Sequence, residues 1–325
     1  MKDVNGELIR FDSSVKERNG ATGNSSVCVL MSTYNGEHYV EEQISSIAAQ
    51  DEVSVFLKVR DDGSSDRTIE ITSNSAEKYG IDCFIERGSN LGFLDSFEKL
   101  LLEAEGHDYY AFSDQDDVWD SRKLKKAVRA LEGSKETPAL YASSVVITDE
   151  NLSPISRNDF PGFTYSIRSE FVRHRLAGHT MVWNDSLQKK IRAIGRLSAW
   201  SHDQHIVLAG LLSSAALYLD SASYVKHRRL PGSITPGGGS PMKRIRHELE
   251  MTINVSGKFD RCTLATELLE LRTKLGREDI EFLRSVTSYK QSFASRIGFA
   301  FSPLLSCGMG AGDLEARAAV LLGRF

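Results

Sequence analysis

The chain has 325 residues, of which 41% are hydrophobic, so it can bury one large core or two smaller ones. Its formal net charge of −4 argues against nucleic acid as the main partner, and no stretch reaches the ~18 uninterrupted apolar residues of a membrane span. The four cysteines are scattered without a CxxC pair, which argues against a zinc site or a disulfide framework and favours a reduced, cytosolic chain.

The first half of the chain alternates predicted strands and helices. Residues 1–25 have no apolar signal core and are rich in Gly, Asn and Ser, which predicts a flexible extension. Apolar runs predict strands at 26–31, 53–60, 81–86 and 109–112. Apolar residues at helical spacing predict helices at 40–48, around 69–76, at 91–104 and from Ser121. This alternation predicts an α/β fold whose mostly parallel sheet is covered on both faces.

The second half is less regular. Strands are predicted at 139–148 and 176–183, with a loop-rich segment between them, and two shorter strands at 215–220 and 223–229. Helices are predicted from Asp185, over 200–214, and at 241–255, 262–275 and 278–291, followed by a mixed apolar and basic tail. Three roles stay open for the C-terminal helices: closing over a substrate site, contacting a membrane surface, or packing against the rest of the chain.

An acidic loop is the strongest local feature. In FSDQDDVW, at 112–119, Asp114, Asp116 and Asp117 follow a buried strand and precede a helix, and open α/β sheets bind ligands at this position. Adjacent carboxylates repel one another unless a cation neutralises them, and oxygen ligands suit Mg²⁺ or Mn²⁺. The alternative is a solvated loop in which Asp117 or Asp120 caps the helix.

The other strand ends are also acidic rather than glycine-rich. No GxGxxG follows the first strand, and the chain has no GxxxxGK[ST], which disfavours a dinucleotide-binding dehydrogenase and a P-loop enzyme. Asp61 and Asp62 follow the second strand, where a carboxylate can accept hydrogen bonds from a ribose hydroxyl or a base N–H. An Asp-Gly turn is the alternative.

Two further positions are candidates for chemistry. Asp203 lies in the first turn of a predicted helix, either as a carboxylate that takes a proton or as part of the helix cap. His227 ends a predicted strand, where packing is the common role of a histidine. Between Tyr224 and His247 there are six Lys or Arg and no acidic residue, which indicates an anion site or a solvated loop.

Six motifs occur in order along the chain: STYNGEHYVEEQISSIAAQ (32–50), VRDDGSSDRT (59–68), NLGFLDSFEKLL (90–101), FSDQDDVW (112–119), AGHTMVWN (177–184) and HDQ (202–204). Together they resemble family 2 glycosyltransferases, and most of all the bacterial rhamnosyltransferase-like branch that builds surface polysaccharides. The resemblance spans residues 26–235 and implies a GT-A domain over 26–239, with a helical region at 240–325.

The resemblance also implies roles for individual residues. Asp203 would be the catalytic base, and Asp116 and His227 would bind a divalent metal, Mn²⁺ or Mg²⁺. The residues implied to hold the nucleotide-sugar donor are Ser32, Thr33, Tyr34, Glu37, Asp62, Asn90, Gly92, Asp114 and Arg228. Gln204 and His205 replace the aromatic residues usual after this Asp, Ser96 replaces an amide, and Val225 replaces an Arg.

The expected function is inverting transfer of a sugar, such as the rhamnose that this branch suggests, from a nucleoside-diphosphate donor to a saccharide or lipid-linked saccharide. Such transfer needs one base and a cation on the leaving diphosphate, not the two flanking carboxylates of a glycosidase. The alternatives are an inactive nucleotide-sugar-binding protein and a sugar nucleotidyltransferase. The expected location is the cytoplasm, with peripheral contact to the inner face of the membrane through the C-terminal region.

Overall fold

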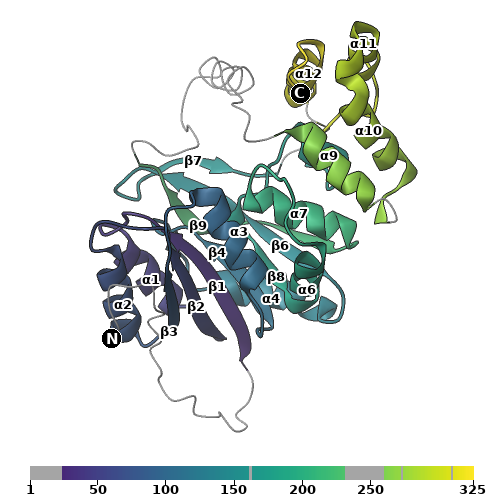
Figure 1. Ribbon diagram of the computed structural model, residues 1–325. Helices are drawn as coiled ribbons and strands as arrows, with labels where there is room; N and C mark the ends of the chain where they lie inside the picture. The colour runs from purple at the N-terminus through teal and green to yellow at the C-terminus, as the bar shows by residue number, and fades with distance from the viewer. Residues whose placement is uncertain (1–23, 161–162, 231–259, 272–273, 309) are drawn as a thin grey trace. The chain divides into compact units, whose positions relative to one another are not determined.

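The computed structural model describes residues 24–160, 163–230, 260–271, 274–308 and 310–325 (Figure 1). They fall into two compact units. Unit 1 contains the described residues of 1–159, 177–193 and 215–230, and unit 2 contains those of 160–176, 194–214 and 231–325. Two segments that precede residue 239 therefore group with the C-terminal helices, whereas the sequence analysis places a single boundary between residues 239 and 240.

Unit 1 is built on one nine-stranded sheet with the order β3-β2-β1-β4-β8-β6-β9-β5, and β7 pairs with β6. The strands are β1 (Ser25–Thr33), β2 (Val53–Asp61), β3 (Asp82–Arg87), β4 (Tyr109–Ser113), β5 (Val118–Trp119), β6 (Ala139–Thr148), β7 (Pro154–Asn158), β8 (Val182–Asn184) and β9 (Ala216–Arg228). The long ladders β3-β2-β1-β4 and β6-β9 are parallel, and the antiparallel pairings of β5, β7 and β8 are short. The predicted α/β class with a mostly parallel central sheet is confirmed.

Helices cover both faces of this sheet. They are α1 (Val40–Ala48), α2 (Thr68–Tyr79), α3 (Phe93–Glu103), α4 (Lys123–Leu131) and α6 (Asp185–Ile194). Because side chains alternate along a strand, Val27 and Val29 of β1 face the core that α1 and α4 close, whereas Leu30 faces the other way. On that second face Phe97 of α3 packs on Phe112, the register partner of Leu30, with 5.5 Å between ring centroids. In Figure 1, α3 crosses the face of the sheet that is turned to the viewer.

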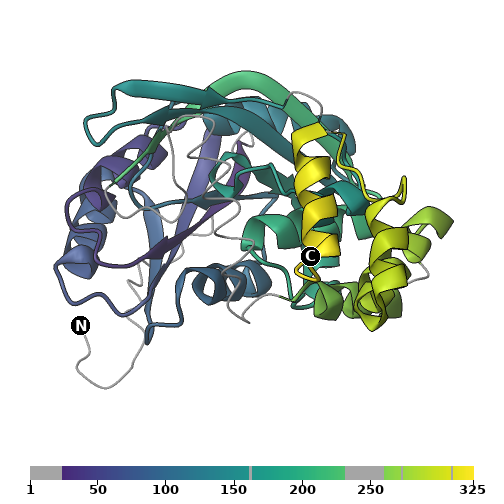
Figure 2. The ribbon, with the colours of Figure 1, turned by 90° about the horizontal axis from the view of Figure 1, so that it is seen from above.

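Three predictions in the second half of the chain are wrong in detail. The segment expected to be a loop contains β7 and α5 (Ile167–Val172). The apolar run 176–183 forms a 3₁₀ turn at Gly178–Thr180 and only then β8, because Thr180 bonds back to the carbonyl of Ala177. The two short strands expected at 215–229 are one strand, β9, which pairs with β6 and is the long green strand in Figure 2. The break predicted at Asp220 is a bulge, where this side chain accepts a hydrogen bond from the N–H of Ala222.

Unit 2 is helical. Its helices are α5 (Ile167–Val172), α7 (His202–Leu212), α9 (Arg261–Glu270), α10 (Arg277–Ser288), α11 (Phe293–Ala300) and α12 (Gly310–Leu321). Its core is mostly leucine and alanine and contains a cluster of aromatic rings, in which Phe282 packs on Phe171 and Phe299. The helices expected at 262–275 and 278–291 are present as α9 and α10, the tail adds α11 and α12, and the helix expected at 241–255 lies outside the described residues. Among the described helices, none is long and apolar enough to cross a bilayer.

Candidate functional site

The carboxyl ends of β1, β2 and β4 lie at one edge of the sheet, because these strands are neighbours and parallel. The loop after β1 carries Tyr34, the loop after β2 carries Asp62, and the loop after β4 carries the acidic run that starts at Asp114. The structure therefore brings the unit 1 residues expected to bind the donor to a common edge.

Gln115 connects the acidic loop to the loop after β1. Its side chain accepts a hydrogen bond from the Tyr34 N–H at 2.9 Å and donates one to the Tyr34 carbonyl at 3.0 Å. A Cβ on Gly36 would lie 2.3 Å from Oε1 of Gln115, so this bridge requires glycine there. The Tyr34 side chain itself is 49% exposed, which leaves its ring available for stacking on a planar ligand.

Asp62 is held by the protein rather than left open to a ligand. Its carboxylate pairs with Arg60 and accepts hydrogen bonds from the N–H groups of Leu91 and Gly92, both at 2.8 Å. The Arg60 and Asp62 side chains are 2% and 3% exposed. The backbone at Gly92, just before α3, has φ of +89°, a conformation that favours a residue without Cβ. Asp62 thus fixes the loop that begins at Asn90, and its role as a direct nucleoside ligand stays a prediction.

The other residues expected around the base also support the loops. The Ser32 hydroxyl lies 2.6 Å from the Ser96 hydroxyl, which gives the unusual Ser96 a partner on β1. Thr33 donates to the buried carboxylate of Asp61 at 3.0 Å. Glu37 accepts a hydrogen bond from the Arg67 N–H at 3.1 Å, and so ties the loop after β1 to the start of α2. Asn90 is exposed.

Four side chains of unit 1 form a group that can hold a cation: Asp114, Asp117, His179 and His227. One candidate ligand atom from each lies within 4.8 Å of the others. The pairing of β5 with β9 sets Val118 opposite Lys226, which places Asp117 beside His227, with 2.8 Å between Oδ1 and Nδ1. His179, in the 3₁₀ turn before β8, lies with Nδ1 3.2 Å from Oδ2 of Asp114.

The donor set fits a divalent cation. The two imidazole rings stack at 4.6 Å with 6° between their planes, an arrangement that disfavours two positively charged rings. Oδ2 of Asp117 and Nε2 of His179 are buried and make no hydrogen bond within the described part of the chain. Two carboxylates and two imidazoles with unused buried lone pairs are suitable ligands for a metal ion.

The acidic loop is strongly perturbed electrostatically. Burial and the neighbouring carboxylates of Asp114 and Asp117 raise the pKa of Asp116 to about 7. Burial lowers the pKa of His227, but the carboxylates, Asp117 first, outweigh it and raise the pKa to about 9. Behind the loop, burial lowers the pKa of Lys123 to about 7, although Asp117 and Asp114 act to raise it. The Lys123 Nζ lies 3.3 Å from the centroid of the Trp119 ring.

Asp116 does not belong to the four-residue group, although it was the carboxylate expected to bind the metal. Its carbonyl accepts a hydrogen bond from Nε of Arg228 at 2.9 Å. The rest of the Arg228 guanidinium is bonded to Glu42 and to the carbonyl of Glu150, and it lies over the ring of Tyr39. In this arrangement Arg228 positions the acidic loop and the first helix, and a direct contact with the diphosphate stays a prediction.

His179 is the site residue that the sequence analysis did not single out. It lies inside the motif AGHTMVWN, where the apolar residues after it suggested a strand. The sequence feature that could have identified it is the histidine itself, because a histidine in a turn between a glycine and a strand is rarely needed for packing. Its partners come from the loop 62 to 65 positions earlier and from β9, the strand after β8 in the chain, so spacing alone does not reveal the group.

Asp203 lies in unit 2, in the first turn of α7. Ser201 is the N-cap of this helix, since its hydroxyl accepts a hydrogen bond from the N–H of Gln204 at 3.1 Å. Capping therefore does not explain Asp203. The Gln204 side chain donates to the carbonyl of Glu170 on α5 at 3.0 Å, which accounts for an amide in place of the usual aromatic residue. Oδ1 of Asp203 lies 2.6 Å from Nε2 of His202.

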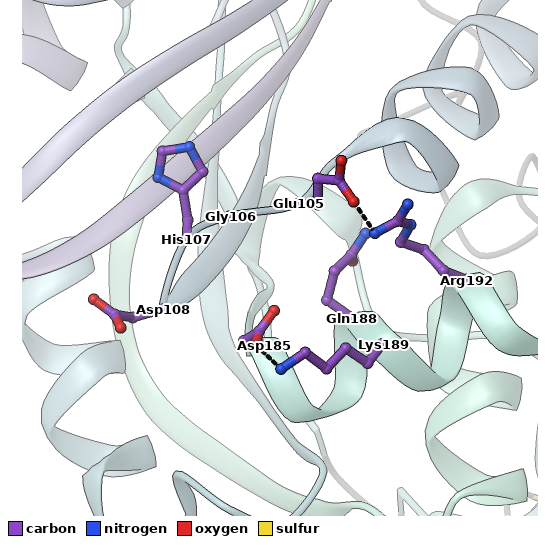
Figure 3. Close-up of a pocket in the computed structure, with 8 residues that line it drawn as sticks. All are labelled: Glu105, Gly106, His107, Asp108, Asp185, Gln188, Lys189 and Arg192. Carbon is purple, nitrogen blue, oxygen red and sulfur yellow. Dashed lines mark hydrogen bonds and ion pairs between the residues drawn. The ribbon is translucent and has the colours of Figure 1, made fainter. Parts of the chain in front are cut away.

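A hollow of 540 Å³ lies at the amino-terminal end of β4, and the pairing of its charged side chains argues against it as the functional site. Figure 3 shows its lining, in which Arg192 pairs with Glu105 and Lys189 pairs with Asp185. These four charges pair with one another, and the remaining carboxylate of the lining, that of Asp108, accepts hydrogen bonds from the N–H and the hydroxyl of Ser26. The carboxyl edge of the sheet, with two carboxylates and two imidazoles grouped so that they can hold a cation, is the better candidate.

Comparison with known proteins shows which family this chain resembles. The family model described as Glycosyl transferase family 2 matches residues 28–186. The dTDP-rhamnosyl transferase RfbG of Shigella flexneri is 32% identical over 158 residues, which cover 43% of this chain and 54% of that protein. The putative glycosyltransferase EpsE of Bacillus subtilis is 36% identical over 107 residues, 33% of this chain and 38% of that protein. The chain thus spans about half, or less, of the length of these relatives.

A solved structure shares the fold over most of the chain. S. aureus TarS 1-349, crystallised in complex with UDP-GlcNAc, superposes with a TM-score of 0.53 at 18% identity, over 92% of this chain and 91% of that one. The likeness confirms the expected GT-A fold.

Proposed function

Because residues 28–186 belong to glycosyl transferase family 2, we propose that the chain is an inverting glycosyltransferase that uses a nucleoside-diphosphate sugar. The observation that carries this proposal is the gathering of Asp114, Asp117, His179 and His227 in and beside the loop that Gln115 ties to Tyr34. This arrangement pairs a cation site with an exposed aromatic ring, which are the two parts needed to hold a diphosphate and a base.

The residues have distinct tasks in the proposed reaction. Tyr34 stacks on the base, and the carboxylates and imidazoles of the four-residue group hold a divalent cation. When bound there, the cation supplies positive charge to the departing diphosphate. Asp203 takes the proton of the acceptor hydroxyl as its oxygen forms a bond to the anomeric carbon and the bond to the diphosphate breaks. Attack opposite the leaving group inverts the anomeric carbon.

The finer identity of the substrates rests on relatives. RfbG is named a dTDP-rhamnosyl transferase, which supports rhamnose as the donor sugar and a growing surface polysaccharide as the product. The acceptor in this proposal is a saccharide or a lipid-linked saccharide. The two imidazoles of the cation site favour Mn²⁺ over Mg²⁺, which prefers oxygen ligands and water.

A donor panel tests the proposal directly. Purified protein with Mn²⁺ is incubated with dTDP-rhamnose, UDP-GlcNAc, UDP-glucose and GDP-mannose, and release of each nucleoside diphosphate is measured. We expect one donor to be hydrolysed or transferred well above the rest. Hydrolysis of none, together with no thermal shift by any nucleotide, would contradict a nucleotide-sugar enzyme.

Loss of one ligand of the four-residue group should weaken the binding of the cation. We expect His179→Ala and Asp117→Asn each to lower Mn²⁺ affinity, measured by calorimetry without donor, by at least about tenfold, or about 1.4 kcal/mol. Activity at limiting Mn²⁺ should fall in parallel, and EDTA should abolish it. His107→Ala, which removes a histidine from the other end of β4, is the matched control and should leave Mn²⁺ binding unchanged.

The comparison with Asp116→Asn decides which carboxylate binds the metal. If Asp116→Asn lowers Mn²⁺ affinity by tenfold and Asp117→Asn does not, the family-based assignment of Asp116 is right and the four-residue group is not the cation site. Full activity in EDTA would remove the metal from the proposal altogether.

The C-terminal region supports a further part of the proposal, a contact with an anionic lipid surface. Phe293, Ile297 and Phe301, on and next to α11, are 69%, 40% and 72% exposed, and Ala294 and Gly298 between them are exposed too. From 282 to 312 the sequence has no acidic residue and three basic ones, so its charge complements anionic headgroups. The area that one face of this helix, about 12 Å long, can bury is far smaller than the ~800 Å² per partner that a stable dimer needs. Shallow insertion into a bilayer needs no such area.

The combined variant Phe293→Ser with Phe301→Ser should bind anionic vesicles at least about tenfold more weakly than the unchanged chain, because each buried Phe contributes ~1.5–3 kcal/mol. Sedimentation with phosphatidylglycerol vesicles measures it, and Ile155→Ser, which alters a 50% exposed residue of β7, is the control. Equal binding of both variants, or a dimer in ultracentrifugation that the double variant dissolves, would contradict the lipid contact.

A further inference from the structure

A buried carboxylate stands behind the proposed base in unit 2. The side chain of Glu170, on α5, is 0% exposed, and its Oε2 lies 2.6 Å from Nδ1 of His174. The opposite nitrogen of that imidazole, Nε2, lies 4.0 Å from Oδ2 of Asp203. The three groups thus form a row, carboxylate–imidazole–carboxylate, that ends at Asp203. The His174 side chain is 11% exposed and the Asp203 side chain 22%, so only the Asp203 end reaches solvent.

Charge in this row favours a protonated imidazole. A buried carboxylate without a cation is costly, and within the described residues the Glu170 side chain makes its hydrogen bond and ion pair with His174. Burial lowers the pKa of His174, but Glu170, and then Asp203, outweigh it, so that the pKa is raised. With Nδ1–H donated to Glu170, the second N–H of the ring faces Asp203.

We propose that Glu170 and His174 are positioning residues for Asp203: the buried carboxylate holds the imidazole in place, and the imidazole orients the Asp203 carboxylate and keeps it ionised. This inference rests on the proposed role of Asp203 as the base. The carboxylate of Glu170 balances the positive charge of the His174 ring. The ring therefore orients Asp203 but lowers the pKa of Asp203, and so its strength as a base, less than an unpaired cation would. The arrangement has the logic of a catalytic triad, in which a buried carboxylate orients an imidazole.

A purely structural role explains the row less well. The side chain of Gln204 already ties α7 to α5 by its bond to the Glu170 carbonyl, and Ser201 already caps α7. Apolar residues would pack α5 on α7 without the cost of burying two ionisable groups. Two other charged residues of this segment form ion pairs away from the row: Arg168 of α5 pairs with Glu278, and Arg173, just after α5, pairs with Glu315.

The coupling can be measured without any substrate. The titratable groups that face the His174 ring are Glu170 on α5 and Asp203 on α7, whose other oxygen faces His202. In NMR titrations of the folded protein, Asp203→Asn should lower the pKa of His174 by at least about half a unit, as expected for charges about 4 Å apart even in water. Arg173→Gln, which removes a neighbouring charge outside the row, should shift it by less. An unchanged His174 titration in Asp203→Asn would overturn the proposal.

Rate measurements separate this inference from the proposed function. His174→Gln keeps a donor but loses the charge, so we expect kcat to fall about tenfold with KM for the donor unchanged. The acidic limb of kcat/KM should move to higher pH, because Asp203 loses a neighbouring cation and its pKa rises. If Asp203→Asn is fully active, the assigned base is wrong. If Asp203→Asn is inactive while His174→Gln keeps the wild-type rate and pH profile, Asp203 is the base but Glu170 and His174 do not position it. If His174→Gln lowers the melting temperature but leaves the acidic limb of kcat/KM at the same pH, the proposed positioning role of Glu170 and His174 is also wrong.

Discussion

Asp203→Asn is expected to lower the rate of sugar transfer by about 10²–10⁴-fold, the usual contribution of a positioned general base. The amide has the shape of the carboxylate but cannot accept the proton of the acceptor hydroxyl. Nucleotide binding should be kept, because the residues expected to hold the donor lie in unit 1 and Asp203 lies in unit 2. The rate is measured as release of nucleoside diphosphate in the presence of acceptor, and donor affinity by calorimetry.

Stability should change little in this variant. Ser201 rather than Asp203 caps α7, so the substitution removes only a favourable charge in the first turn and its contact with two imidazoles, about 1 kcal/mol. Asp185→Asn is the matched control, because it removes a carboxylate from the first turn of α6. Transfer at the wild-type rate by Asp203→Asn, or a product that retains the donor's anomeric configuration, would show that Asp203 is not the base of an inverting reaction.

The sequence was sufficient to locate the acidic loop but not to choose among its carboxylates. An apolar run followed by Asp114, Asp116 and Asp117 predicts a strand end with a cation site, and the structure places this loop there. Which carboxylate faces the imidazoles depends on the register of β5 against β9, a pairing across more than 100 residues. No local pattern encodes that register, because β5 is only two residues long.

The segment that carries α5 was the least predictable part of the helical unit. Because α5 is only six residues long, its pair of apolar residues, Ile167 and Phe171, is too short a pattern to separate a helix from the expected loop. The chemistry of this segment appears only when α7 is packed beside it and Asp203 meets His174. In the same way, the unusual Gln204 is explained by a bond to a carbonyl 34 positions earlier in the chain. Such long-range polar contacts need the three-dimensional fold.

Asp62→Ala is expected to destabilise the protein by ~3–5 kcal/mol, because it leaves the Arg60 guanidinium buried without its carboxylate. Sequence reasoning predicts a different result, weaker nucleotide binding with the fold intact. The structure argues against an intact fold, because the carboxylate also accepts the N–H groups of Leu91 and Gly92 where α3 begins. The free energy of unfolding is measured by urea denaturation, with calorimetry of nucleoside diphosphate binding alongside.

Two further variants separate the roles of this carboxylate. Asp66→Ala removes a carboxylate from the same loop that accepts hydrogen bonds from Thr68 and from the N–H of Glu37, but it strands no cation, and it should cost only about 1 kcal/mol. Adding Arg60→Met to Asp62→Ala removes the stranded charge and should recover a large part of the lost stability. If the double variant regains stability yet still fails to bind nucleotide, Asp62 contacts the nucleoside as well. If Asp62→Ala alone keeps full stability and loses only affinity, the buried ion pair does not hold this loop. The donor would then have to reach the carboxylate through a rearrangement of the loop at Asn90.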